Sequence, residues 1–220
     1  MTNKIKVLLI SASVLALWIS CEKKSSQRFK HEDYFSNGAL KSRVWYKDGK
    51  ADGFGYWFFE NNNLEVKAFY KDGRQVGPSY YYSPEGRLKA FIFYNLAGDG
   101  TAMYGKKYDD AGNVIEEGGG PISVDFTLPA KVKRNEIFTF TALMAKPPDS
   151  KMDIFIDIQD NENDMKETKK YQASEGEYFI QVQYRFKSKG NHPIDILSSL
   201  QDTVRGIIRR DTINFEVQVE

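Results

Sequence analysis

The sequence has little of the residue types that most often carry chemistry. Its 220 residues include one cysteine, Cys21, and two histidines, His31 and His192. A single cysteine cannot form a disulfide within the chain. A Ser–His–acid triad needs a histidine held on a rigid element, whereas His31 lies in a polar stretch and "GNHP" around His192 predicts a turn. We therefore expect no catalytic residues and no cofactor.

The chain also lacks an excess of either charge and, beyond its first twenty residues, a long apolar run. Lys and Arg number 31 against 30 Asp and Glu, so the formal net charge is +1. Nucleic-acid binding depends on a basic surface that neutralises phosphates, so we expect no nucleic-acid partner. No later run approaches the roughly 20 apolar residues that cross a bilayer.

The first twenty residues are typical of an export signal. Lys4 and Lys6 give a basic start, and residues 7–19 form an almost uncharged apolar run. That run is short for a membrane span of about 20 residues. Ser20 is small, Cys21 follows it, and the next residues are polar.

The stretch "LWISC" at 17–21 resembles the lipobox of bacterial lipoproteins, although Trp18 stands where that motif usually has Leu, Val or Ile. The resemblance implies that residues 1–20 are a lipoprotein signal peptide and that Cys21 is acylated, with palmitate or a similar chain. Stable anchoring needs about two acyl chains at about 0.8 kcal/mol per buried methylene, and a mature lipoprotein carries more than one. The implied location is the bacterial cell envelope, lipid-anchored at the outer membrane on its periplasmic side or at the cell surface. An ordinary signal peptide or an uncleaved anchor is the alternative.

Two breaks divide the rest of the chain. Residues 21–33 are polar and rich in Lys, Ser and Glu, which predicts a flexible tether. Residues 116–121, "EEGGGP", combine three glycines with a proline, which disfavours regular structure and predicts a linker. These breaks leave two folded units, at 34–115 and 122–220.

The first unit repeats itself every 24 residues, since "YKDGKADG" at 46–53 returns as "YKDGRQVG" at 70–77. "NG" and "DG" favour tight turns, and "LEVKAFY" and "PSYYY" have the composition of strands, so each repeat predicts a hairpin. One hairpin alone is marginal in water, and we therefore expect successive hairpins to stack and cover one another's rings in dry columns. The aligned tyrosines are Tyr46, Tyr70 and Tyr94 in one column and Tyr56, Tyr80 and Tyr104 in another.

These residues resemble the MORN repeat in its bacterial variant form. Its pattern of an aromatic, a turn with "NG" or "DG", and "G-K-x-x-G" is matched by "YKDGKADGFGYWFF", and the likeness covers about residues 34–115. One branch of that family is labelled antitoxin-like, and other MORN proteins are regarded as scaffolds or as modules that contact lipid or protein.

Residues 122–220 have no such period. Apolar and polar residues alternate at 122–128, 138–142, 152–158, 178–184 and 213–219, with weaker runs at 194–197 and 204–208. About seven short strands over roughly 100 residues predict a β-sandwich, and "GEY" at 176–178 resembles the tyrosine corner of immunoglobulin-like domains. The expected fold class is all-β, with stacked MORN-like β-hairpin repeats followed by an immunoglobulin-like β-sandwich.

The candidates for binding are aromatic and acidic. Trp45, Trp57, Tyr81 and Phe91 fall between the repeat columns, and exposed rings of this kind can stack on sugars or form an interaction hot spot. Packing against the next unit or the second domain is the alternative. "DNENDMKE" at 160–167 crowds acidic residues, but its spacing does not fit a calcium loop, so we expect a solvated turn and no metal site. "KKYDD" at 106–110 also predicts a solvated turn.

Together these patterns predict a non-catalytic, membrane-anchored lipoprotein that acts as a binding or scaffolding module of the cell envelope. The membrane is contacted through the acyl anchor, and the further partner is a protein or a glycan. An antitoxin or immunity-like protein that neutralises a partner by binding is the alternative. An enzyme would require a cluster of polar side chains in a pocket where the two units meet.

Overall fold

A computed structural model of the chain describes residues 27–96, 99–124, 131–160, 165–172 and 178–220. The export signal and Cys21 lie outside these ranges, as do Gly176 and Glu177 of the "GEY" stretch. The described part contains no helix that could cross a membrane. All of its regular structure is β-strand, in three antiparallel sheets.

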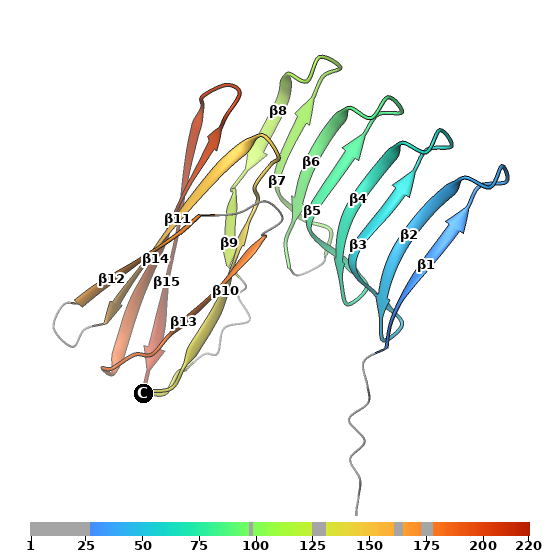
Figure 1. The fold of residues 1–220 in the computed structure, drawn as a ribbon. Coiled ribbons are helices and arrows are strands. Elements are labelled where there is room, and N and C mark those ends of the chain that lie inside the picture. Colours follow the sequence, from blue (N-terminus) through green and yellow to red (C-terminus); the bar gives the residue numbers. More distant parts are fainter. Residues whose placement is uncertain (1–26, 97–98, 125–130, 161–164, 173–177) are drawn as a thin grey trace, which may run out of the picture.

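The first eight strands form one continuous sheet in which each strand pairs with its neighbours in sequence (Figure 1). The sequence prediction of stacked hairpins is therefore confirmed. The strands are β1 (Arg28–Tyr34), β2 (Leu40–Lys47), β3 (Lys50–Phe58), β4 (Leu64–Lys71), β5 (Arg74–Tyr82), β6 (Leu88–Tyr94), β7 (Ala102–Tyr108) and β8 (Val114–Gly119).

Tight turns at one end of this sheet follow from the "DG" pairs. Asp48 and Gly49 join β2 to β3, Asp72 and Gly73 join β4 to β5, and all four residues have positive φ. Positive φ at both central residues matches the twist of the flanking strands. The equivalent connection between β6 and β7 is longer. It is closed by a hydrogen bond from Asn95 N to Thr101 O and is not a two-residue turn.

This longer connection corrects the predicted alignment of the tyrosines. Tyr80 pairs with Phe91, which in turn pairs with Lys106. Lys106 therefore takes the place in the sheet that Tyr56 and Tyr80 have in the earlier repeats, and Tyr104 lies two pairs further along, opposite Phe93. The spacing grows from 24 to 26 residues at this step.

The remaining strands form a β-sandwich of the immunoglobulin-like class, as predicted. One sheet has the order β13-β10-β9 and the other β12-β11-β14-β15. Each sheet therefore combines strands from the first and the second half of this segment, as in a Greek key. The strands are β9 (Ile122–Val124), β10 (Phe138–Met144), β11 (Ser150–Asp160), β12 (Met165–Gln172), β13 (Phe179–Tyr184), β14 (Gly190–Asp202) and β15 (Ile208–Val219).

Several predicted boundaries were wrong. Residues 28–33, expected in the tether, belong to β1, and residues 116–119, expected in the linker, belong to β8 and pair with β7. The weak run at 204–208 is mostly the turn between β14 and β15. The polar strand β12 was not predicted, because an edge strand with one solvent-facing side shows little apolar alternation.

The two faces of the eight-stranded sheet differ in what covers them. The face toward the sandwich, called here the sandwich face, carries the row Tyr56, Lys67, Tyr80, Phe91 and Lys106. The opposite face, called the open face, carries the row Val44, Gly55, Ala68, Ser79, Ile92, Gly105 and Gly118.

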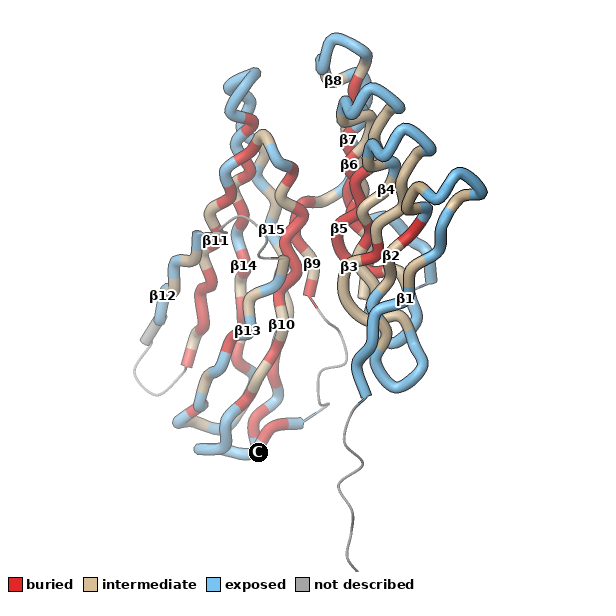
Figure 2. Tube along the Cα trace, turned by 45° about the vertical axis from the view of Figure 1, so that its right-hand side comes forward, coloured by how far each residue is buried: buried red, intermediate tan, exposed pale blue. Residues whose placement is uncertain are grey.

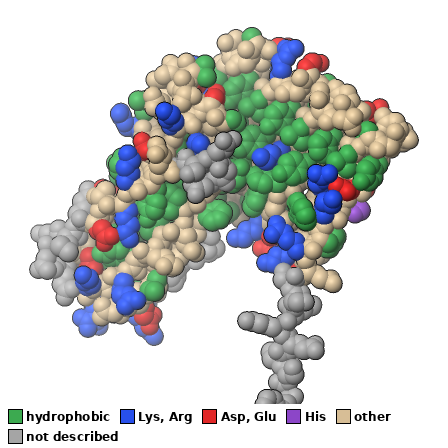
Figure 3. Space-filling view, in the orientation of Figure 1, with side chains coloured by type: hydrophobic (Ala, Val, Ile, Leu, Met, Phe, Trp, Pro, Cys, Tyr) green, Lys and Arg blue, Asp and Glu red, His purple; other side chains and the backbone are tan. Residues whose placement is uncertain are grey.

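On the sandwich face, Tyr80, Phe91, Phe93 and Tyr104 are buried and join the apolar interior of the sandwich in one hydrophobic core. Burial therefore rises along the sheet from β1 to β7 (Figure 2). The ring of Tyr178 also reaches the sheet, with its centroid 5.8 Å from that of Phe54. Hydrophobic side chains gather over a broad part of the sheet beside the sandwich (Figure 3).

The dry column expected of Tyr46, Tyr70 and Tyr94 was wrong in one respect. The three rings share the open face but are only half-buried. Burial first, and then the neighbouring Tyr81 and Tyr46, raise the pKa of Tyr70. The fully buried rings of the repeats lie on the sandwich face.

Candidate functional site

The four aromatic residues singled out from the sequence do not form one surface. Phe91 is fully buried at 0% exposure, so it is not available to a ligand. Trp45 is 37% exposed but lies on the sandwich face, where the Arg28 guanidinium is 5.9 Å from its ring. Trp57 and Tyr81 lie together on the open face, and they are the two that the structure brings into one site.

Trp57 and Tyr70 form the first ring pair of that site. A Cβ atom added to Gly55 would lie 2.5 Å from Cη2 of Trp57, so the indole lies flat over the Gly55 backbone. The indole and phenol centroids are 5.9 Å apart with planes tilted by 52°, within the distance range of favourable aromatic pairs. The glycine at 55 is thus explained by the close approach of the ring.

Tyr81 and Tyr94 form the second pair, one repeat later. Their hydroxyl oxygens are 3.4 Å apart. Burial first, and then the hydrogen bond and proximity of Tyr81, raise the pKa of Tyr94. The pair presents hydroxyl groups and ring faces to the open side of the sheet.

The ring pairs lie over a floor of small residues. Gly55, Ala68 and Ser79 follow one another across neighbouring strands and are all buried. The side-chain amide of Gln75 donates to the Ser79 hydroxyl at 2.8 Å. We call Trp57, Tyr70, Tyr81 and Tyr94 the ring row. Trp57 of this row packs on Gly55 of the floor, and all four residues are only partly buried, as residues of a recognition surface must be.

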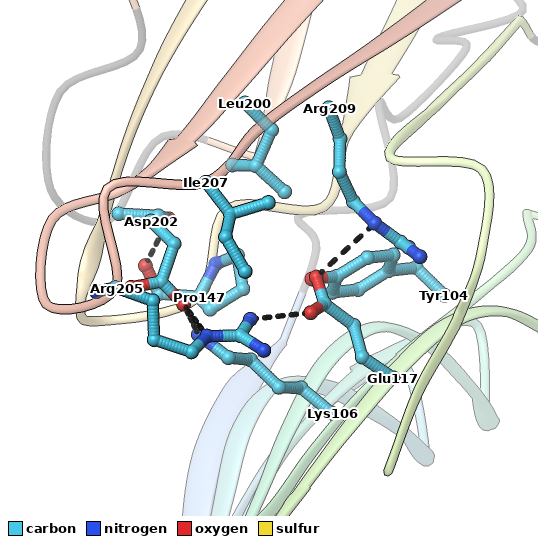
Figure 4. A pocket seen from close by; sticks show the side chains of 10 residues that line it. Tyr104, Lys106, Glu117, Pro147, Leu200, Asp202, Arg205, Ile207 and Arg209 are labelled. Atoms are coloured by element: carbon cyan, nitrogen blue, oxygen red, sulfur yellow. Dashed lines mark hydrogen bonds and ion pairs between the residues drawn. The ribbon is translucent and has the colours of Figure 1, made fainter. Parts of the chain in front are cut away.

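A second cluster, of charged side chains, lies where the repeat sheet meets the sandwich (Figure 4). The sequence analysis did not predict this cluster. Lys106 is 1% exposed, in contrast to the solvated turn expected at 106–110. Its Nζ donates to Asp149 at 2.8 Å and to Asp202 at 2.9 Å. A buried lysine is tolerated because two carboxylates from the sandwich neutralise it.

Arg205 and Glu117 extend this cluster. Arg205 donates from Nε to Asp202 at 2.7 Å and from a terminal nitrogen to Glu117 at 2.5 Å. Tyr104 donates its hydroxyl to Glu117 at 2.6 Å, and the Arg209 Nε lies 3.6 Å from the same carboxylate. We call Lys106, Glu117, Asp149, Asp202 and Arg205 the junction cluster.

Hydrogen bonds and ion pairs within the junction cluster shift the pKa values of Asp202, Glu117 and Arg205. Burial opposes ionisation of Asp202, but hydrogen bonds from the Arg205 backbone, Lys106 and the Arg205 side chain outweigh it and hold the Asp202 pKa far below its usual range. The Glu117 pKa is lowered in the same way, against burial, by Tyr104, Arg205 and Arg209. The Arg205 pKa is raised by Glu117 and, despite burial, by Asp202.

The junction cluster is closed. Its polar groups bond to one another, and the cavity among them has a volume of about 10 Å³, close to the least space that one water molecule needs. A polar cluster is thus present at the junction, as an enzyme would require, but it has little room for a substrate. The signal in the sequence was the lengthened loop before β7, which moves Lys106 into a column of rings.

The predicted turn at His192 was wrong. His192 lies on β14 and is fully buried, with Nδ1 3.0 Å from Gln159 O and Nε2 3.1 Å from Ser188 O. Asp160 beside it is also buried, and it accepts hydrogen bonds from the Lys187 and Ser188 backbone. His192 and Asp160 therefore hold β11 and β14 to the loop at 187–188. Residues 161–164 of the acidic stretch lie outside the described residues.

Within the described ranges, no three His, Cys, Asp or Glu side chains are grouped as metal ligands. No protein-family model matches the chain, and no curated protein matches it in sequence. The likeness to MORN repeats therefore stays a prediction from the residues quoted above.

Proposed function

We propose that this protein is a lipid-anchored, non-catalytic module of the bacterial envelope that binds a protein or glycan partner through the ring row. The observation that carries the proposal is the half-exposed row of Trp57, Tyr70, Tyr81 and Tyr94 on a buried floor. Aromatic side chains held rigid in this way lose little conformational entropy on binding, and they dominate the energetics of many interfaces.

Two further features support a scaffolding role. The eight strands form an extended, antiparallel sheet whose open face is not covered by the sandwich (Figure 2). The junction cluster ties this sheet to the sandwich through ion pairs that join Lys106 to Asp202 and Glu117 to Arg205. A rigid connection of this kind fixes the orientation of the open face relative to the rest of the chain.

The lipoprotein motif around Cys21 completes the proposal. An acyl anchor followed by a short polar segment would hold the repeat sheet near the membrane surface. The MORN-like repeat pattern supports a module that contacts protein or lipid, and it offers no catalytic set. The proposed partner is accordingly another component of the envelope.

Affinity capture with the mature chain tests this proposal. We expect immobilised wild-type protein to retain a partner from envelope extracts, and the double variant Trp57→Ala, Tyr81→Ala to retain at least about tenfold less, as loss of hot-spot rings does. Trp45→Ala, on the other face, is the matched control and should bind like the wild type. Equal capture by all three proteins would contradict the proposal.

A further inference from the structure

An open trough lies on the open face beyond the ring row, at β6, β7 and β8. Its volume is about 320 Å³, within the range of roughly 300–1,000 Å³ that is usual for ligand sites. Gly105 and Gly118 form its floor, and a Cβ added to either would meet nothing within 4 Å. Ile92 and Met103 provide apolar walls, and Lys107 and Glu116 stand at the rim.

The repeat pattern shows what occupies the same place elsewhere in the sheet. Strand pairing makes Gly55, Ser79 and Gly105 equivalent floor positions on β3, β5 and β7. The residue two places later is Trp57 in the first case and Tyr81 in the second. Gly55 and Ser79 are both buried on this face, the former beneath the indole of Trp57.

The third position has no such ring. The residue two places after Gly105 is Lys107, whose Nζ pairs with Glu116 at 2.8 Å. Both side chains of this pair are at least half exposed, at 50% and 66%. Gly105 is consequently only half-buried and Gly118 is exposed, in contrast to Gly55 and Ser79. The sheet thus repeats the floor without the ring that covers it.

We propose that this trough accepts an aromatic side chain, tryptophan or tyrosine, from a protein partner. The proposal rests on the proposed binding function and gives it a specific contact. An inserted ring would lie on the glycine backbone as Trp57 lies on Gly55, between Ile92 and the thioether of Met103, an arrangement that favours aromatic rings. It would also continue the ring row by one step.

The chemistry of the trough favours an aromatic ring over a sugar. The side chains that face it from the floor and walls are apolar, so they offer no hydrogen-bond partners to the sugar hydroxyl groups that would face them. The rim supplies one cation and one carboxylate. Glu116 can accept a hydrogen bond from an indole N–H or a phenol, and Lys107 can lie against the ring face.

Nuclear magnetic resonance titration of the soluble mature chain with N-acetyltryptophanamide tests the site directly. We expect saturable ring-current shifts at the amides of Gly105 and Gly118 and at the methyl groups of Ile92 and Met103. Lys107→Tyr should supply the missing ring from within the chain, shift the Gly105 amide without the probe, and weaken probe binding by about tenfold or more. Lys107→Met removes the same charge but adds no ring, so it should lose only the contact of Lys107 with the ring face and bind the probe more tightly than Lys107→Tyr.

These experiments distinguish failure of the trough as a ring site from failure of the proposed binding function. No saturable shift at the two glycines, or equal probe binding by Lys107→Tyr and Lys107→Met, would overturn the trough as a ring site. With a captured partner, weaker retention by Lys107→Tyr than by Lys107→Met supports the contact. Equal retention by both variants overturns the contact while leaving the ring-row proposal intact, and absence of any captured partner counts against the binding function itself.

Discussion

Single side chains on the two faces of the repeat sheet have opposite roles. Phe91, Phe93 and Tyr104 are buried against the sandwich and belong to the core. Trp57, Tyr70, Tyr81 and Tyr94 lie on the open face and are only partly buried. Aromatic content alone cannot distinguish these roles, because strand alternation assigns the face but not what packs against it.

The two roles predict different costs of truncation. Phe91→Ala should lower the free energy of unfolding by about 3–5 kcal/mol, as for a fully buried ring. Tyr70→Ala should cost less, about 1–2 kcal/mol, because the ring is already half in water. Chemical denaturation of the two variants checks this difference, and a larger loss for Tyr70→Ala would mean that the open face is in fact the core.

The carboxylate of Asp202 predicts a dependence of stability on acid. Its pKa is lowered in the folded chain, below an unfolded value of about 3.9. Its contribution is therefore complete above about pH 4 and is lost as pH falls further toward the folded value. Between pH 6 and pH 3, wild type should lose more stability in urea than Asp202→Asn does.

Asp110→Asn is the control for that measurement. Its carboxylate is 80% exposed and pairs with Lys89 at 2.9 Å, and exposed pairs contribute little because solvent and salt screen them. If Asp202→Asn follows the wild-type pH profile as closely as Asp110→Asn does, the junction ion pairs do not stabilise the fold.

Strands and turns were the best-predicted part of the structure. The "DG" pairs gave the turns at 48–49 and 72–73, and apolar alternation located β10, β11, β13 and β15. The junction cluster could not be predicted, because it depends on a two-residue shift in register at β7 and on loops at Asp149 and Arg205 that are distant in sequence. The trough lacks a ring because Lys107 stands where Trp57 and Tyr81 stand in the earlier repeats.

Two adjacent glycines at the end of β8 test how closely this strand approaches β7. Gly119 has a φ of +85°, and a Cβ there would lie 2.0 Å from the Met103 carbonyl oxygen, whereas Gly118 has open space. Gly119→Ala should therefore cost roughly 1–3 kcal/mol or more, as for a strained backbone position. Gly118→Ala should change the unfolding midpoint little. Similar midpoints for both variants would show that β8 does not pair with β7 as described.

The described part of the chain combines a repeat sheet and a sandwich. The sheet and the sandwich share one hydrophobic core and the junction cluster, so we expect them to unfold together. The anchor is predicted from "LWISC" alone. The proposed function accordingly combines this predicted anchor with the open face of the repeat sheet.

The proposed anchoring is tested by replacing Cys21, the residue predicted to be acylated. Cys21→Ala should abolish fatty-acid labelling and move the protein from the membrane fraction to the soluble fraction, because the acyl chains supply the membrane affinity. Ser20→Ala keeps a small residue before Cys21 and should label normally. A Cys21→Ala protein that still labels and still sediments with membranes would contradict the lipoprotein assignment.

Hydroxyl-radical footprinting of the free and partner-bound chain tests the role of the open face most directly. The account predicts that Trp57, Tyr81 and Tyr94 are oxidised in the free chain and protected in the complex, while Phe91 is unmodified in both. Oxidation of Trp57, Tyr81 and Tyr94 that is unchanged by the partner, or protection confined to Trp45 on the sandwich face, would contradict it.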